Sequence, residues 1–279
     1  MEIWLLCGII KIEMSFKSYD ALSSEASFQI KGVVDIWHDY LKNTLVGVYL
    51  HGSIALGYFS EGTSDIDILI VTNRRIPGDE RLSIAEKIIA LDGKPSPLEM
   101  SAIYEKDLKP WKYPPACQFH YSDAWTERYK QLLNGRIKEN FLVDTDFTDK
   151  DIACHVHLTN QCGICAYGKP IGEVFPAVPE NDFWDSISAE VTQYDFHAYH
   201  PRFFASNILT LGRILSYKCK KRILSKYEAA SWTIAHVPER FRYIIENAVK
   251  SWYFGKTMAA YKREDLEDLG QLLVKEIIG

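Results

Sequence analysis

The chain has 279 residues, of which 47% are hydrophobic and 25% are charged, and its formal net charge is -5. This composition is typical of a globular protein with a full apolar core, and no run of about 18 apolar residues predicts a membrane span. The mild acidity argues against a nucleic-acid partner and suits a cationic ligand. No secretory signal is recognised, so we expect a cytoplasmic protein whose six cysteines are thiols rather than a disulfide framework.

The first half of the chain alternates between helical and strand patterns. Apolar residues recur at helical spacing over residues 23–43, and a β-rich run follows over 45–50. A second strand is expected over 65–72, a helix over 81–91 and a third strand over 97–104. This order predicts an α+β or α/β domain with a mixed sheet.

The second half of the chain has mainly helical patterns. They cover residues 149–166, 181–193, 202–218, 226–236, 238–253 and 261–278. We therefore predict a first domain over residues 14–165 and an all-α C-terminal domain over 166–279. Residues 1–13 are expected to lie outside the fold, with a packed N-terminal strand as the alternative.

One segment of the second half combines cysteines with histidines at a spacing that zinc sites also use. Its members are Cys154, His155, His157, Cys162 and Cys165. On a single helix the three cysteines share one stripe and the histidines point elsewhere, which favours packing over zinc or redox chemistry.

The polar residues after the first two strands form the most informative pattern. Asp65 and Asp67 lie two apart on an expected strand, so their carboxylates leave the same face. Two close carboxylates repel each other unless a cation lies between them, and Mg²⁺ prefers carboxylate and phosphate oxygens. Gly52 and Ser53 directly follow a strand, where a close backbone and a hydroxyl can hold phosphate, and Ser64 is placed to do the same.

Glu99 adds a third carboxylate on the third expected strand. If the strands are neighbours, Glu99 lies near Asp65 and Asp67 and is either a general base or a third metal ligand. The alternative without a function is a tight turn followed by a hairpin with acids on its surface. The combination of Gly52, Ser53, the two aspartates and Glu99 disfavours it.

These residues resemble the Gly-Ser…Asp-x-Asp signature of the polymerase-β-like nucleotidyltransferase superfamily. More narrowly, the chain resembles the aminoglycoside 3''-/spectinomycin 9-adenylyltransferases from about residue 45 almost to its end. The landmarks of this resemblance are residues 46–53, 64–69, 97–99, 110–114, 209–214 and 225–232. The last two lie outside the general superfamily signature and tie the helical half to this family.

The resemblance implies transfer of AMP from ATP, with Mg²⁺, to a hydroxyl of a small cationic antibiotic bound in a cleft between the domains. It places Mg²⁺ on Asp65 and Asp67 and makes Glu99 the base. It also implies that Ser53 and Ser64 contact phosphate.

Three further expectations come from the helical half and from one tryptophan. The resemblance implies that Arg213 and Lys226 reach the ATP phosphates, and that Trp125 packs against the antibiotic unless it belongs to the core. Streptomycin-modifying members carry acids where this chain has Tyr199 and Phe203. Because of this difference, the sequence does not predict which antibiotic is the substrate.

Two other functions are the alternatives. One is a nucleotidyltransferase that acts on protein or RNA, and the other is a binding module without catalysis.

Overall fold

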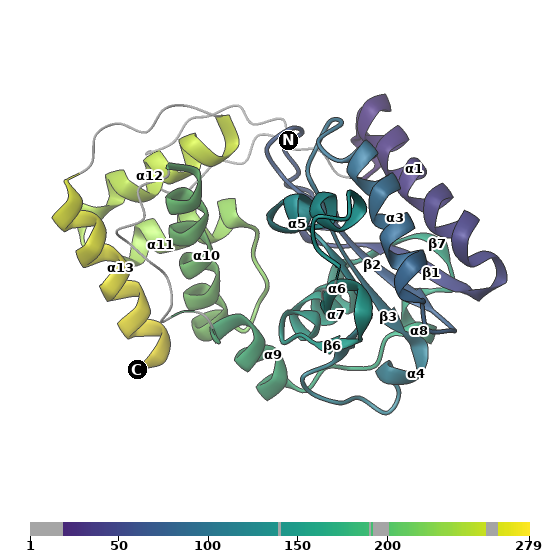
Figure 1. Cartoon of the computed structure of the whole chain (residues 1–279). Helices are drawn as coiled ribbons and strands as arrows, with labels where there is room; N and C mark the ends of the chain where they lie inside the picture. The colour runs from purple at the N-terminus through teal and green to yellow at the C-terminus, as the bar shows by residue number, and fades with distance from the viewer. Residues whose placement is uncertain (1–18, 139–140, 190, 192–200, 255–261) are drawn as a thin grey trace. The chain divides into compact units, whose positions relative to one another are not determined.

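The computed structural model describes residues 19–138, 141–189, 191, 201–254 and 262–279, with no side-chain description for residues 141, 201–203, 254 and 263 (Figure 1). The expectation for residues 1–13 therefore lies outside the described residues. Contacts divide the chain into two compact units, one over Lys17–Ser186 and the other containing Ile187–Gly279.

A mixed five-stranded sheet organises the first unit, with strand order β5-β3-β2-β1-β7. Only β2 and β3 run parallel among these pairs, and the other neighbours are antiparallel. The strands are β1 (Leu45–Leu50), β2 (Ile66–Thr72), β3 (Leu98–Tyr104), β5 (Phe119–Tyr121) and β7 (Ile164–Gly168). A separate two-stranded pair joins β4 (Ala116–Cys117) to β6 (Phe147–Thr148). The predicted mixed sheet and its first three strands are confirmed.

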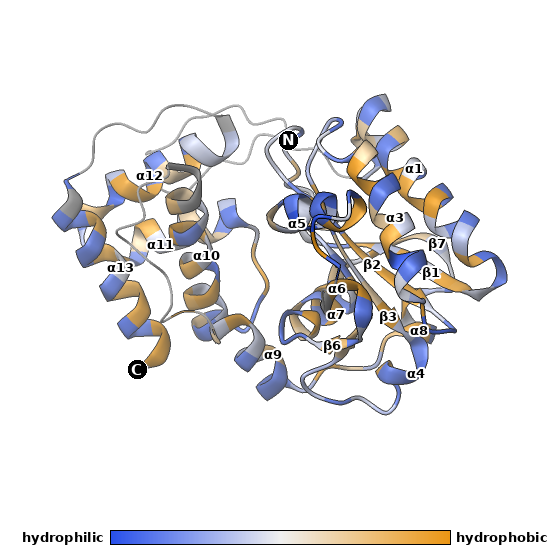
Figure 2. Ribbon diagram, viewed as in Figure 1, coloured by the Kyte–Doolittle hydropathy of each residue, from blue (hydrophilic) through white to orange (hydrophobic). Residues whose placement is uncertain are grey.

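Helices α1 (Ser24–Leu41) and α3 (Gly78–Leu91) cover one face of this sheet (Figure 1). Ser23 caps α1 by accepting a hydrogen bond from the Ala26 amide at 3.0 Å. Both helices are hydrophobic on one side and hydrophilic on the other (Figure 2). Their apolar sides pack on alternate strand residues such as Ile68 and Met100. Trp37 of α1 is fully buried in this core. Burial on this face accounts for the period of two along the strands.

The opposite face of the sheet packs against α7 (Asp151–Cys162), and we call it the α7 face. Leu69, Val71 and Ile103 lie on it and contact a cluster that includes Ile152 and Val156 of α7. Because strand side chains alternate, other residues of odd number on β2 and β3 also point to this face.

The structure corrects the prediction of one helix over residues 149–166. Helix α7 ends at Cys162, and residues 164–168 form β7, which pairs with β1. Gly163 permits the break, since a Cβ there would lie 2.5 Å from the carbonyl oxygen of Thr159. A domain boundary after residue 165 would cut β7. The predicted division is therefore too early, and contacts place it after Ser186.

The predicted stripe of buried cysteines is also wrong. Cys154 and Cys162 are half-buried and Cys165 is exposed, whereas the buried residues of α7 include Ile152 and Val156. Among the described residues, no three His, Cys, Asp or Glu side chains are grouped so that they could hold a metal ion by themselves.

The second unit is helical as predicted. Helix α10 packs against each of the three helices that follow it. The four helices are α10 (Pro201–Lys220), α11 (Lys226–His236), α12 (Glu239–Phe254) and α13 (Arg263–Ile278). Ser225 and Glu228 form a reciprocal cap at the start of α11, which fixes where that helix begins. No described helix has the length and apolar character that crossing a membrane requires.

Short helices complete the described elements. They are η1 (Tyr19–Ala21), η2 (Lys42–Thr44), α2 (Gly52–Ala55), α4 (Glu105–Leu108), α5 (Asp123–Leu133), α6 (Phe141–Asp144), α8 (Ile171–Val174) and α9 (Glu180–Ser188). Helix α9 is fastened to residues 110–114, because Trp111 Nε1 donates to Asp182 at 2.8 Å and the Tyr113 hydroxyl donates to Asp185 at 2.6 Å.

Arg81 on α3 is a buried cation that fastens α3 to the segment before β6. Its Nε donates to the carbonyl of Ile76 and its Nη1 to that of Thr145, both at 2.8 Å, and its Nη2 bonds Asp146. We expect Arg81→Met to destabilise the fold by about 2–4 kcal/mol, because it leaves buried acceptors without a donor.

Thermal unfolding followed by circular dichroism measures this effect, and the midpoint should fall by about 5–10 °C. Arg75→Met is the matched control. The Arg75 side chain is 47% exposed and also bonds Asp146, so its loss should cost less than about 1 kcal/mol. Equal effects of the two changes would contradict the special role of the buried arginine.

Candidate active site

The parallel pairing of β2 with β3 brings two of the predicted carboxylates side by side. Asp67 of β2 and Glu99 of β3 are register partners, so their side chains project side by side from the α7 face of the sheet. Asp65 lies two residues before Asp67, directly ahead of β2, and all three acids are half-buried. The structure therefore places the acids at the edge of the sheet where β2 and β3 begin.

The turn after β1 packs tightly against this carboxylate pair. Gly52 has a φ of 60°, and a Cβ there would lie 1.8 Å from Asp67 Oδ2. The amide of His51 donates to the backbone carbonyl of Asp67 at 3.1 Å, which fixes the turn to β2. Glycine is thus required both for the left-handed backbone and for the close approach of the carboxylate.

The two predicted serines differ in their surroundings. The Ser53 hydroxyl, one residue into α2, is buried and has no hydrogen-bond partner among the described residues. A buried hydroxyl without a partner is costly, so a ligand oxygen at this point would stabilise it. The Ser64 hydroxyl instead accepts a hydrogen bond from the Ser60 amide at 3.1 Å and holds the loop before β2. Its hydroxyl proton is not used in that bond.

Gly52→Ala tests the close approach. The new methyl group must displace either the turn or the Asp67 carboxylate, and we expect the activity that depends on this site to fall about 100-fold. Gly57→Ala is the control, because Gly57 also has a positive φ, 76°, yet nothing lies within 4 Å of its Cβ position. Both variants carry the cost of a positive φ, so Gly57→Ala should lose some thermal stability and keep its activity, whereas Gly52→Ala should lose at least as much stability and also its activity. Equal activities would show that the contact with Asp67 is unimportant.

Three histidines beside the carboxylates were not predicted as site residues. His51 follows β1, and its ring centroid lies 4.7 Å from that of His155 on α7. Both nitrogens of His51 and Nδ1 of His155 are buried and find no hydrogen-bond partner in the part of the chain that the structure describes. Burial, and to a smaller extent the neighbouring His155, holds the pKa of His51 well below its ordinary value, and burial also lowers the pKa of His155. Both imidazoles are therefore neutral near pH 7.

The third histidine, His120, lies on β5. Its Nδ1 is 3.0 Å from the Ser101 hydroxyl. Burial lowers the pKa of His120, while the negative charge of Glu99 opposes this shift. His120 therefore lies within electrostatic reach of the predicted base. The sequence carried no signal for this, because His120 is brought to Glu99 only by the pairing of β5 with β3.

The predicted phosphate-binding cations belong to the helical unit. Arg213 lies half-buried on α10, and Lys226 is the first residue of α11. The Lys226 ammonium donates to the Ser206 hydroxyl at 3.2 Å and lies 3.5 Å from the centre of the Trp252 ring. Arg213 is seven residues, or two helical turns, beyond Ser206, so both residues lie on one side of α10. Their role toward ATP stays a prediction.

The predicted antibiotic contact Trp125 lies on α5, half-buried, and packs against the core beneath α1 and α3. Its role toward a substrate stays a prediction. Of the two departures from the family pattern, Tyr199 and the side chain of Phe203 lie outside the described residues.

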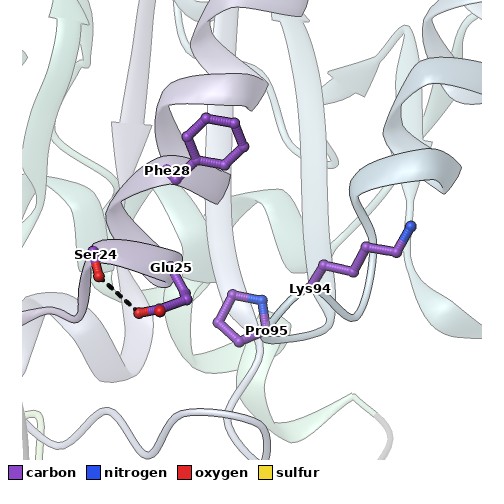
Figure 3. A pocket seen from close by; sticks show the side chains of 5 residues that line it. All are labelled: Ser24, Glu25, Phe28, Lys94 and Pro95. Atoms are coloured by element: carbon purple, nitrogen blue, oxygen red, sulfur yellow. Dashed lines mark hydrogen bonds between the residues drawn. The ribbon is translucent and has the colours of Figure 1, made fainter.

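One surface pocket is lined by none of the candidate site residues. It is formed by the start of α1 and the loop before β3, and it contains none of the residues discussed above (Figure 3). Its lining residues are Ser24, Glu25, Phe28, Lys94 and Pro95.

Comparisons with known proteins match both units. Residues 30–137 match the nucleotidyltransferase domain, and residues 173–276 match the aminoglycoside adenylyltransferase C-terminal domain. Both halves of the chain are thus similar to domains of this class of enzyme, and the C-terminal match is to the aminoglycoside adenylyltransferases. The chain is a nucleotidyltransferase by its N-terminal domain, and the family-specific match lies in the helices that carry Arg213 and Lys226.

Two relatives show how far the likeness extends along the chain. The chain is 26% identical to a spectinomycin 9-adenylyltransferase of Campylobacter jejuni, over 81% of this chain and 85% of the relative. It is 23% identical to an aminoglycoside (3'') (9) adenylyltransferase of Shigella flexneri, over 92% of this chain and 97% of the relative.

A solved structure has the same fold. It is a spectinomycin adenyltransferase of Enterococcus faecalis crystallised with ATP and spectinomycin, with a TM-score of 0.78 at 22% identity, over 91% of this chain and 99% of that one. The predicted fold, a polymerase-β-like domain followed by an all-α domain, is confirmed.

Proposed function

We propose that this protein transfers AMP from ATP to a hydroxyl group of an aminocyclitol or aminoglycoside antibiotic of the spectinomycin or streptomycin type. The observation that carries the proposal is the register of Asp67 with Glu99, against which the Gly52 turn is pressed. The named activities of the relatives support the same chemistry. A protein or RNA acceptor is the less favoured alternative.

The donor set fits Mg²⁺ bound with ATP. Asp65 and Asp67 offer hard oxygen ligands at a spacing of two. The buried Ser53 hydroxyl has no hydrogen-bond partner within the described ranges of the chain. Since no described group of three side chains holds a metal by itself, phosphate oxygens would complete the coordination. Bound there, Mg²⁺ would neutralise charge that develops on the phosphates.

The chain's own residues supply the remaining steps. Glu99 accepts the proton of the substrate hydroxyl, whose oxygen attacks the α-phosphorus of ATP in line while the bond to pyrophosphate breaks. Ser53 and Ser64 hold phosphate oxygens through their hydroxyl protons. Arg213 and Lys226 are assigned to the triphosphate on the family resemblance, since basic side chains offset its negative charge.

One further assignment completes the proposal. The enzyme acts in the cytoplasm, where ATP is supplied, and the free state of the described cysteines agrees with such a compartment.

A transfer assay tests the proposal. The purified protein is incubated with Mg²⁺, ATP labelled at the α-phosphorus, and separate panels of spectinomycin, streptomycin, other aminoglycosides, protein and RNA. We expect labelled AMP on spectinomycin or streptomycin and release of pyrophosphate. Labelling of protein or RNA alone would favour the alternative acceptor, and labelling of nothing would reject the proposed reaction.

A further inference from the structure

A second pair of polar side chains lies next to Asp67 and Glu99 on the α7 face. Strand β5 runs antiparallel to β3, and Ser101 is the register partner of His120. Ser101 and Glu99 are two apart on β3, so both leave the same face. His120 lies between Phe119 and Tyr121 on β5. Both of these neighbours are buried on the opposite face of the sheet, with α1 and α3. His120 therefore points to the carboxylate side of the sheet.

This arrangement makes His120 a diagonal neighbour of Glu99. In an antiparallel pair, diagonal neighbours are about 7–8 Å apart at the backbone, a span that two long side chains can close. The charge of Glu99 acts on the pKa of His120, which agrees with a short separation. On the α7 side of the sheet, His155 lowers the pKa of the same imidazole and Asp149 raises it.

We propose that His120 is a positioning residue for Glu99, fixed in turn by Ser101. The Ser101 hydroxyl donates to Nδ1 of His120 across the observed 3.0 Å. The imidazole proton then resides on Nε2, and this N–H donates to the Glu99 carboxylate and holds it toward the substrate hydroxyl. A histidine whose second nitrogen is fixed by a neighbour orients a functional group in this way. The inference rests on the proposed function, in which Glu99 is the base.

Two amide substitutions separate this role from simple packing. The amide of glutamine reaches approximately the place of Nε2, whereas that of asparagine reaches only the place of Nδ1. We expect His120→Asn to lower kcat about 10–100-fold with the KM for ATP nearly unchanged, and His120→Gln to restore most of kcat. His157→Asn is the control, since His157 stacks on Phe183 at 4.0 Å and takes no part in the site. A raised KM for the antibiotic with unchanged kcat would overturn the proposal, because it would make His120 a substrate contact.

A double-mutant comparison shows whether His120 acts through Glu99. In the Glu99→Gln background, His120→Asn should have little further effect, because residues that act as a unit are not additive. A further 10-fold or greater fall would show that His120 acts independently and would reject the proposal.

A spectroscopic measurement decides the contact without any activity. In protein labelled with ¹⁵N-histidine, the His120 resonances (assigned by their loss in His120→Asn) should show protonated Nε2 and unprotonated Nδ1 at pH 7. Glu99→Gln should shift the Nε2 resonance, whereas Asp35→Asn, which removes an exposed acid on α1, should not. A protonated Nδ1, or no response to Glu99→Gln, would overturn the proposal. If the wild-type protein transfers AMP to nothing, the proposed function fails and these resonances still report on the contact of His120 with Glu99.

Discussion

Asp67→Asn should abolish AMP transfer, with kcat/KM lowered at least about 1,000-fold while the fold is retained. A loss of this size corresponds to about 4 kcal/mol of transition-state stabilisation. The physical reason is that Asp67 is both the register neighbour of Glu99 and the group that Gly52 approaches, so it lies at the centre of the proposed metal seat. An amide of the same shape keeps the packing but removes the charge that attracts the cation.

Transfer of labelled AMP and thermal unfolding, measured on the same samples, check this prediction. Asp35→Asn is the matched control, because Asp35 forms an exposed ion pair with Lys31 on α1. It should retain full activity and stability. Near wild-type activity in Asp67→Asn would mean that the cation binds elsewhere and that the assignment of the acids is wrong.

The position of the acids could be predicted from the sequence because two strong local patterns coincide. Asp65 and Asp67 open a strand that becomes fully apolar, and Glu99 occupies the second position of the next strand. Alternation then fixes the face of each side chain once the strands pair. The exact register of Asp67 with Glu99 is a tertiary property that only the structure supplied.

The break between α7 and β7 could not be predicted from the same patterns. Residues 149–166 contain apolar and small residues that satisfy a helical period throughout. Strand β7 has only five residues, too few for a distinct period of two, and it is held by pairing with β1 more than a hundred residues earlier. Long-range pairing of this kind leaves little local signal.

The histidines were missed for a related reason. His51 and His155 come together only because α2, which follows β1, packs near α7, and their sequence separation follows no ligand spacing. The Cys/His segment drew attention to zinc, whereas the structure packs His155 against His51 and stacks His157 on Phe183. Proximity in the fold, rather than motif spacing, identifies these residues.

Glu99→Gln should separate nucleotide binding from chemistry. The amide cannot accept the proton of the substrate hydroxyl, so we expect kcat to fall about 10²–10⁴-fold, the usual contribution of a positioned general base. Binding of ATP with Mg²⁺, measured by calorimetry, should stay close to that of the wild-type protein, because the proposed seat is formed by Asp65 and Asp67.

The control for this change lies just beyond the same strand. Glu105 follows β3 and pairs with Lys169 at 3.2 Å, so Glu105→Gln tests the loss of an acid away from the reacting atoms. It should leave both kcat and ATP binding unchanged. If Glu99→Gln lost ATP binding together with transfer, Glu99 would be a metal ligand first. If it kept its rate, the base would have to be another group on the α7 face, and His120 would be the first to substitute.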